Sequence, residues 1–144
     1  MHETLRLYAT VPFNSRRAVK DTTLPVGGGA DAKSPIYVRK GQEVNYAVHI
    51  MHRRKDLWGE DCDEFRPERW QNRKAGWEFL PFNGGPRICL GQQHALTLAG
   101  FTLTRMMQRF DDIENLDTDP IPRHHFSITT APDHVSIRLH EAGA

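Results

Sequence analysis

The longest regular pattern of apolar residues lies in the C-terminal half of the chain. Over residues 92–110, apolar side chains recur every three or four positions, the spacing that places them on one face of a helix. They are Leu96, Ala99, Leu103, Met106 and Phe110. The pattern predicts one long amphipathic helix over residues 92–110.

Shorter patterns predict small elements in the N-terminal half. A short helix is expected over residues 1–8, because good helix formers run until Pro12, and a proline disfavours helical backbone in the residue before it. Short β-prone stretches at residues 17–19, 36–39 and 43–46 alternate with turns that contain glycine or proline. These stretches indicate a small antiparallel hairpin.

The rest of the chain divides between an irregular segment and a final hairpin. Residues 45–51 are expected to add one helical piece, whereas residues 53–78 are rich in charge, tryptophan and proline and have no sustained period. Residues 126–130 and 135–139 alternate around an Ala-Pro-Asp turn, which predicts a closing hairpin. Together the elements predict a mainly α fold with small antiparallel β hairpins.

Composition and charge limit the function classes. The 144 residues include 19 Lys and Arg against 18 Asp and Glu, a net charge of +1, so nucleic acid is not an expected partner. No stretch approaches the ~18 apolar residues that span a bilayer, and the chain is expected to be soluble and cytoplasmic with no transmembrane segment. Cys62 and Cys89 stand in dissimilar contexts and suggest neither a disulfide nor a cysteine-rich zinc site.

Cys89 lies at the end of a glycine-rich loop. The loop is expected to deliver it to the first turn of the predicted long helix, where unpaired N–H groups and a partial positive charge favour a thiolate over a thiol. A thiolate held in this way suits a soft or borderline metal ion. Taken alone, however, a lone cysteine beside such a loop is more often buried and inert.

The residues around Cys89 are suited to a flat cofactor. Gly85 and Gly91 flank the sulfur, and residues without a side chain permit a macrocycle to approach the backbone. Phe82 would shield the sulfur from water. Arg87 is placed to reach a carboxylate with both arms of its guanidinium group.

The spacing Phe-x-x-Gly-x-Arg-x-Cys-x-Gly over residues 82–91 resembles the haem-binding signature of the cytochrome P450 family at every fixed position. The resemblance implies haem b (iron protoporphyrin IX) as the cofactor, with the thiolate of Cys89 as the axial ligand of the iron. It assigns no catalytic residue beyond that ligand. The other fixed positions, which would bind the cofactor, are Phe82, Gly85, Arg87 and Gly91.

Two further motifs stand in the order expected of that family. Glu3 and Arg6 lie three residues apart, on one helical face, and Arg69 belongs to a Pro-Glu-Arg element. The resemblance implies that the three form a buried structural charge cluster, from which the loss of one member costs roughly 3–5 kcal/mol. Arg16 stands where many relatives carry a second propionate ligand, although Arg17 could take that role or both arginines could be solvated.

Three positions depart from the family pattern. They are His94 where phenylalanine is usual, Leu98 where an acid is common, and Ala9 in place of a proline. His94 could be a second iron ligand, but helical geometry five residues after Cys89 points it beside or away from the iron, so a packing change is expected. The segment around His52 resembles the one before the Pro-Glu-Arg element and is expected to pack without chemistry.

The resemblance covers essentially all 144 residues. It implies the C-terminal portion of the cytochrome P450 fold, one incomplete domain over residues 1–144. The glycine turn at residues 27–29 and the Cys-Leu-Gly-Gln-Gln run at residues 89–93 resemble the fungal alkane and fatty-acid hydroxylases. The implied activity is insertion of one oxygen atom from dioxygen into a C–H bond of a lipophilic substrate, such as an n-alkane or fatty acid. A flavoprotein NADPH reductase would supply electrons, and full-length relatives would lie on the cytosolic face of the endoplasmic-reticulum membrane.

Three hypotheses follow for this chain. The family's oxygen-activating helix lies upstream of the Glu-x-x-Arg pair, so the first is a fragment of a monooxygenase or an inactive truncated gene product. The second is a non-catalytic haem-binding or interaction module that keeps thiolate ligation. The third, a zinc protein, ranks last because the candidate histidines form no recognised ligand set with either cysteine. Those histidines are His49, His52, His124 and His125.

Overall fold

The computed structural model of the chain describes residues 1–119 and 123–143. Helices and strands take equal shares, 28% each. The expected mainly α fold is therefore wrong. Strands also form over residues 22–28 and 110–115, where the sequence patterns predicted a turn and a helix end.

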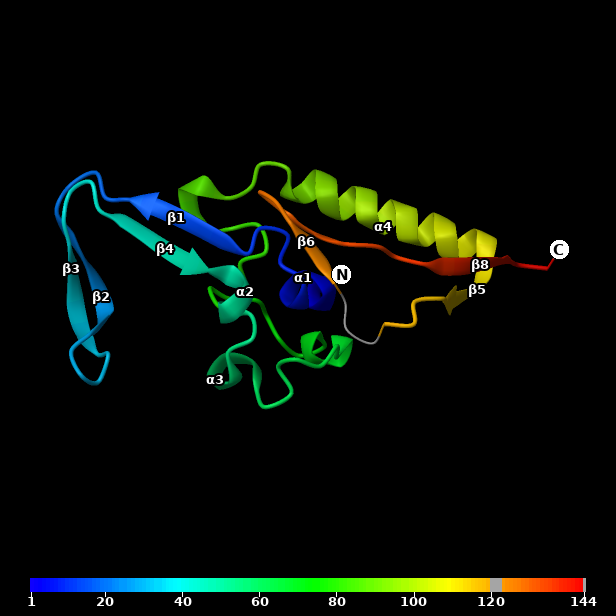
Figure 1. The fold of residues 1–144 in the computed structure, drawn as a ribbon, viewed down its shortest axis with the longest axis horizontal. Coiled ribbons are helices and arrows are strands. Elements are labelled where there is room, and N and C mark those ends of the chain that lie inside the picture. The colour runs from blue at the N-terminus through cyan, green and yellow to red at the C-terminus, as the bar shows by residue number, and fades with distance from the viewer. Residues whose placement is uncertain (120–122, 144) are drawn as a thin grey trace.

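Residues 1–47 form one short helix and two antiparallel strand pairs. Helix α1 (His2–Leu7) is followed by β1 (Phe13–Arg17), which pairs antiparallel with β4 (Glu43–Ala47). Between them, β2 (Thr22–Gly28) pairs antiparallel with β3 (Ser34–Val38). Figure 1 shows the β2–β3 pair at one end of the elongated molecule, connected to its centre through β1 and β4.

Strand β2 continues through glycines that the sequence patterns assigned to a turn. Gly27 has a positive φ of 113°, and the register of the pair shifts between Leu24 and Gly28. A glycine of this kind lets a strand carry a bulge that a side chain would oppose. The turn itself therefore lies later in the sequence than expected.

The middle of the chain is irregular, as predicted, with short helical pieces. These are α2 (Val48–Met51), α3 (Lys55–Trp58) and the 3-10 turns η1 (Pro67–Trp70) and η2 (Gly85–Arg87). The long helix α4 (Gln92–Arg109) follows and agrees with the predicted helix to within one residue. Within the described ranges, no helix is long and apolar enough to cross a membrane.

The C-terminal strands pair differently from the prediction. β5 (Phe110–Asn115) pairs antiparallel with β8 (Ile137–Glu141), and β6 (His124–Phe126) pairs with β7 (Thr130–Pro132). The predicted closing hairpin is therefore wrong in its partner, because β8 pairs with β5. Alternating residues indicate that a strand forms, but they do not say which strand lies beside it.

The buried core lies beside α1 and the irregular segment. Trp58, Cys62 and Phe79 form its centre, and partly buried Leu5 and Trp70 pack against it. The rings are close, with 4.6 Å between the centroids of Trp70 and Phe79. The core therefore joins α1 to the two ends of the irregular segment.

Helix α4 lies apart from this core, along one edge of the molecule in Figure 1. Each of its 18 residues is partly or fully exposed. Leu103, a member of the predicted apolar face, is 51% exposed. The predicted apolar face of α4 is therefore present, but its side chains are exposed to solvent or line a cavity.

Candidate functional site

An apolar cavity of about 740 Å³ lies between α1, the start of β1, the loop before α4, and α4 itself. We call residues 80–91 the cysteine loop. The loop contributes Phe82 and Cys89 to the wall, and α4 contributes one side of its first three turns. The α4 residues on the wall are Ala95, Leu96, Ala99, Thr102 and Leu103.

The cysteine loop folds back on itself so that Cys89 lies beside Phe82. The backbone N–H of Cys89 donates to the carbonyl oxygen of Phe82 at 2.8 Å, and that of Ile88 donates to Gly85 at 3.1 Å. Cys89 is exposed and is not in a disulfide. Because α4 begins at Gln92, Cys89 lies just ahead of the helix and not in its first turn, which corrects the prediction.

Glycines allow the close approaches that this loop needs. Gly85 has a positive φ of 70°, a conformation that residues with a side chain rarely adopt. A Cβ atom on Gly84 would lie 2.7 Å from Trp77 Cζ3, so a side chain at that position would displace the Trp77 ring. A Cβ atom on Gly91 would lie 3.8 Å from the Cys89 sulfur, in ordinary contact with it. Gly84 was missed by the motif, in which it is a variable position.

The two arginines proposed as carboxylate ligands lie outside the cavity wall. Arg87 is exposed at the end of η2. Arg16 is also exposed, and it donates to the carbonyl oxygen of Ser15 at 2.7 Å. Its guanidinium carbon lies 5.5 Å from the ring centroid of Tyr46, within the range of a cation–π contact. Arg17, the alternative, is exposed in β1 opposite Glu43.

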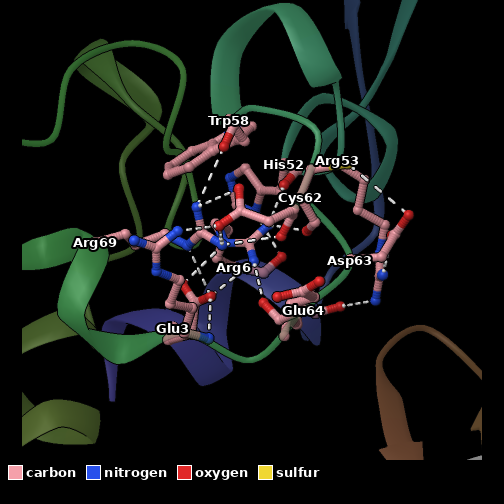
Figure 2. Close-up of polar contacts among 12 residues, drawn as sticks. Glu3, Arg6, His52, Arg53, Trp58, Cys62, Asp63, Glu64 and Arg69 are labelled. Atoms are coloured by element: carbon pink, nitrogen blue, oxygen red, sulfur yellow. Dashed lines mark hydrogen bonds and ion pairs between the residues drawn. The ribbon is translucent and has the colours of Figure 1, made fainter.

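Glu3, Arg6 and Arg69 come together in one buried charge cluster, drawn in Figure 2. Arg6 meets Glu3 through two hydrogen bonds, Nη2 to Oε1 at 2.7 Å and Nε to Oε2 at 2.9 Å. Arg69 Nε reaches the same Oε1 at 2.9 Å. Burial would raise the pKa of Glu3, but hydrogen bonds from both arginines, a tryptophan and a backbone amide lower it to about 2.

Arg6 also binds the backbone of the irregular segment. Its Nη1 donates to the carbonyl oxygens of His52 at 2.8 Å and Cys62 at 2.6 Å, and its Nη2 donates to that of Glu64 at 3.1 Å. Figure 2 shows these carbonyl groups around the guanidinium. An irregular segment has few backbone partners of its own, so buried carbonyls need donors from elsewhere. The sequence motif did not indicate this second function of Arg6.

His52 connects the charge cluster to the cysteine loop. It is fully buried, its Nδ1 lies 3.2 Å from the carbonyl oxygen of Arg6, and its Nε2 accepts the backbone N–H of Leu80 at 2.9 Å. Because Nε2 accepts, the proton is assigned to Nδ1, which donates to Arg6. Burial lowers the pKa of His52 to about 4. The expectation of packing alone missed these two hydrogen bonds.

The three departures from the family pattern lie in different environments. Ala9 is buried, whereas His94 and Leu98 are exposed on α4. The cavity wall does not include His94. Within residues 1–119 and 123–143, no group of three or more His, Cys, Asp or Glu side chains could hold a metal ion.

Three motifs follow one another along the chain: the Glu-x-x-Arg pair, the Pro-Glu-Arg element and the cysteine loop. The sequence model of the family described as Cytochrome P450 matches residues 1–138. The chain belongs to the cytochrome P450 family. The resemblance inferred from the sequence is thereby confirmed.

Curated relatives agree with this membership of the cytochrome P450 family. Cytochrome P450 monooxygenase alt2 of Alternaria solani is 60% identical over 136 residues, 92% of this chain and 25% of the relative. Cytochrome P450 52A13 of Debaryomyces hansenii is 58% identical over 123 residues, 85% of this chain and 24% of the relative. Cytochrome P450 52A3-A of Candida maltosa is 53% identical over 132 residues, 90% of this chain and 25% of the relative. The chain thus spans about a quarter of the length of these cytochromes P450.

Proposed function

We propose that this chain is the haem-thiolate-bearing C-terminal portion of a cytochrome P450 monooxygenase, one incomplete domain over residues 1–144. The observation that carries the proposal is the position of Cys89 and Phe82 on the wall of an apolar cavity, in a chain of this family. The volume of about 740 Å³ lies within the range of cofactor and small-molecule sites, roughly 300–1,000 Å³.

The donor set fits haem b. A single exposed cysteine sulfur beside an apolar wall suits the axial thiolate of a haem iron, and Phe82 lies next to it to limit access by water. Gly91 places no side chain against the sulfur, and Gly85 supplies the positive φ of the loop before it. Arg87 and Arg16 are the proposed partners of the propionates, and Arg16 would exchange its bond to the Ser15 carbonyl for one to a carboxylate.

The bound haem would supply dioxygen activation and insertion of one oxygen atom into a C–H bond. The residues of this chain have supporting functions. Cys89 would provide the thiolate, the apolar face of α4 lines one side of the cavity, and the charge cluster holds α1 against the irregular segment. His52 extends this support to the start of the cysteine loop.

The substrate and partners are proposed from the family resemblance. A lipophilic molecule such as an n-alkane or fatty acid is the proposed substrate, and a flavoprotein NADPH reductase is the proposed electron donor. The full-length protein would act at the cytosolic face of the endoplasmic-reticulum membrane. Nucleic acid is not among the proposed partners, given the net charge of +1.

The test is thiolate ligation by Cys89. The chain would be loaded with haem, reduced under carbon monoxide, and its difference spectrum compared with those of Cys89→Ala and Cys62→Ala. We expect a red-shifted Soret band of the thiolate-carbonyl type in the unmodified chain and in Cys62→Ala, and its loss in Cys89→Ala. A folded chain without the band, or a band that survives in Cys89→Ala, would contradict the proposal.

The same samples separate catalysis from haem binding. Fatty-acid hydroxylation would be assayed with an NADPH reductase wherever the thiolate band is present. Product that depends on Cys89 supports the monooxygenase. A thiolate band without product favours the haem-binding module instead.

A further inference from the structure

Asn14 and Tyr46 hold one residue of the cysteine loop from two sides. The two residues lie directly opposite each other in the antiparallel pair of β1 and β4. The hydroxyl of Tyr46 donates to Asn83 Oδ1 at 2.8 Å, and Asn83 Nδ2 donates to Asn14 Oδ1 at 3.2 Å. Both ends of the Asn83 amide therefore have a partner on the same strand pair, which restricts its orientation.

The backbone of Asn83 is at a turning point of the loop. Its φ is +62°, in the left-handed region where asparagine is tolerated better than most residues. The preceding residue, Phe82, offers the carbonyl oxygen that accepts the N–H of Cys89 at 2.8 Å. A rotation at Asn83 would therefore disturb the neighbour that holds the backbone of Cys89.

Tyr46 is itself well placed to act as a fixed donor. Its side chain is partly buried, and the guanidinium of Arg16 lies over its ring at 5.5 Å. Backbone pairing of β1 with β4 holds Tyr46 opposite Asn14. The donor thus belongs to a regular element, whereas the acceptor Asn83 lies outside any helix or strand.

We propose that Tyr46, with Asn14, is a positioning residue for the cysteine loop: it clamps Asn83 and thereby sets where the Cys89 sulfur lies at the cavity. That the position of the sulfur matters for iron ligation rests on the proposed function. The two hydrogen bonds to Asn83 are independent of it, because they lie within the chain.

Hydrogen exchange at the Cys89 amide tests the clamp without haem. Tyr46→Phe removes one hydroxyl. Tyr37→Phe is the matched control, because Tyr37 lies in the distant strand β3 and its hydroxyl donates at 2.8 Å to Asp21, which precedes β2. We expect the exchange rate of the Cys89 amide to rise about 2- to 13-fold in Tyr46→Phe, the effect of one neutral hydrogen bond. Tyr37→Phe should leave it unchanged.

The amide of Arg66 provides an internal reference for global stability. It donates to Glu3 in the charge cluster at 3.0 Å, away from the clamp. An unchanged Cys89 rate in Tyr46→Phe would overturn the proposal. An equal rise at Arg66 and Cys89 would overturn it too, because it would mean a general loss of stability.

Substitutions at Asn83 provide a rescue test. Asn83→Gly keeps the positive φ but removes both side-chain bonds, so the Cys89 amide should exchange at least as fast as in Tyr46→Phe. Asn83→Asp keeps an acceptor for the Tyr46 hydroxyl and should exchange more slowly than Asn83→Gly. Adding Tyr46→Phe to Asn83→Gly should cause no further rise, and an additive effect would contradict a shared clamp.

The spectrum of the haem-loaded chain gives the second readout. We expect a smaller fraction of the red-shifted thiolate-carbonyl Soret band in Tyr46→Phe and the full band in Tyr37→Phe. If the unmodified chain lacks the band, the proposed function fails, while the exchange rates still decide whether the clamp exists. A full band in Tyr46→Phe together with unchanged exchange would reject the clamp alone.

Discussion

The buried charged and polar side chains Glu3, Arg6 and His52 have hydrogen-bond partners around α1, whereas apolar side chains along α4 are exposed. Glu3, Arg6 and His52 are at most 2% exposed, and each makes several of the hydrogen bonds described above. On α4, by contrast, Phe101 is 64% exposed and Leu103 is 51% exposed. The two regions are opposite in how their side chains are stabilised.

The difference follows from what each backbone needs. An irregular segment cannot satisfy its own carbonyl groups, so when it is buried it depends on donors such as Arg6. The backbone of α4 is satisfied within the helix, and its side chains remain available to line a cavity. The stability of the chain is therefore expected to depend mainly on the α1 region, and cofactor binding on the α4 region.

The largest expected effect comes from removing the centre of the charge cluster. Arg6→Ala should lower the free energy of unfolding by about 3–5 kcal/mol, because it removes one of the two arginine partners of the buried Glu3 carboxylate and the donor of three backbone carbonyls. The control is Arg109→Ala, whose exposed pair with Glu141 at 2.8 Å should contribute only ~0–1 kcal/mol. Urea unfolding of both variants measures the difference. Similar losses in the two would remove the contrast between the regions.

The next effect compares one phenylalanine from each region. Phe79 is 9% exposed and packs against Trp58 and Trp70, so Phe79→Ala should cost about 3 kcal/mol. Phe101→Ala on α4 should change the free energy of unfolding by less than ~0.5 kcal/mol. Thermal unfolding followed by circular dichroism checks both. A large loss in Phe101→Ala would mean that α4 is covered in solution.

The smallest of the three effects is a pH dependence located in the α1 region. Burial lowers the pKa of His52 from 6.5 to about 4, so the unfolded chain binds a proton more readily than the folded chain between these values. The contribution of His52 is fully present above pH 6.5 and is lost as the pH falls to about 4, a change of roughly 2–3 kcal/mol. Burial also lowers the pKa of His49, which acts in the same direction.

Urea midpoints measured across that window test the assignment. His52→Gln should flatten the dependence, whereas His94→Gln on exposed α4 should leave it in place. At lower pH the protonation of Glu3, with its pKa of about 2 against 4.5, removes further stability in both variants. An unchanged slope in His52→Gln would assign the dependence to other groups.

Much of the candidate site could be predicted because its signals are local. The period of apolar residues predicted α4 to within one residue, and the spacing around Cys89 indicated the family before any comparison. Local patterns failed where a contact depends on residues far apart in the sequence. They did not give β8 its partner β5, and they did not indicate that Leu80 donates to His52.

The sequence by itself determined the family, the long helix and the loop that carries Cys89, since each depends on residues close together in the chain. Only the tertiary structure decided that Arg6 serves three carbonyls, that His52 is buried as a neutral ring, and that Tyr46 reaches Asn83 across 37 positions. These contacts join residues that are far apart in the sequence, so no local pattern of residues predicts them. They arise because buried polar groups must find partners wherever the folded chain brings them.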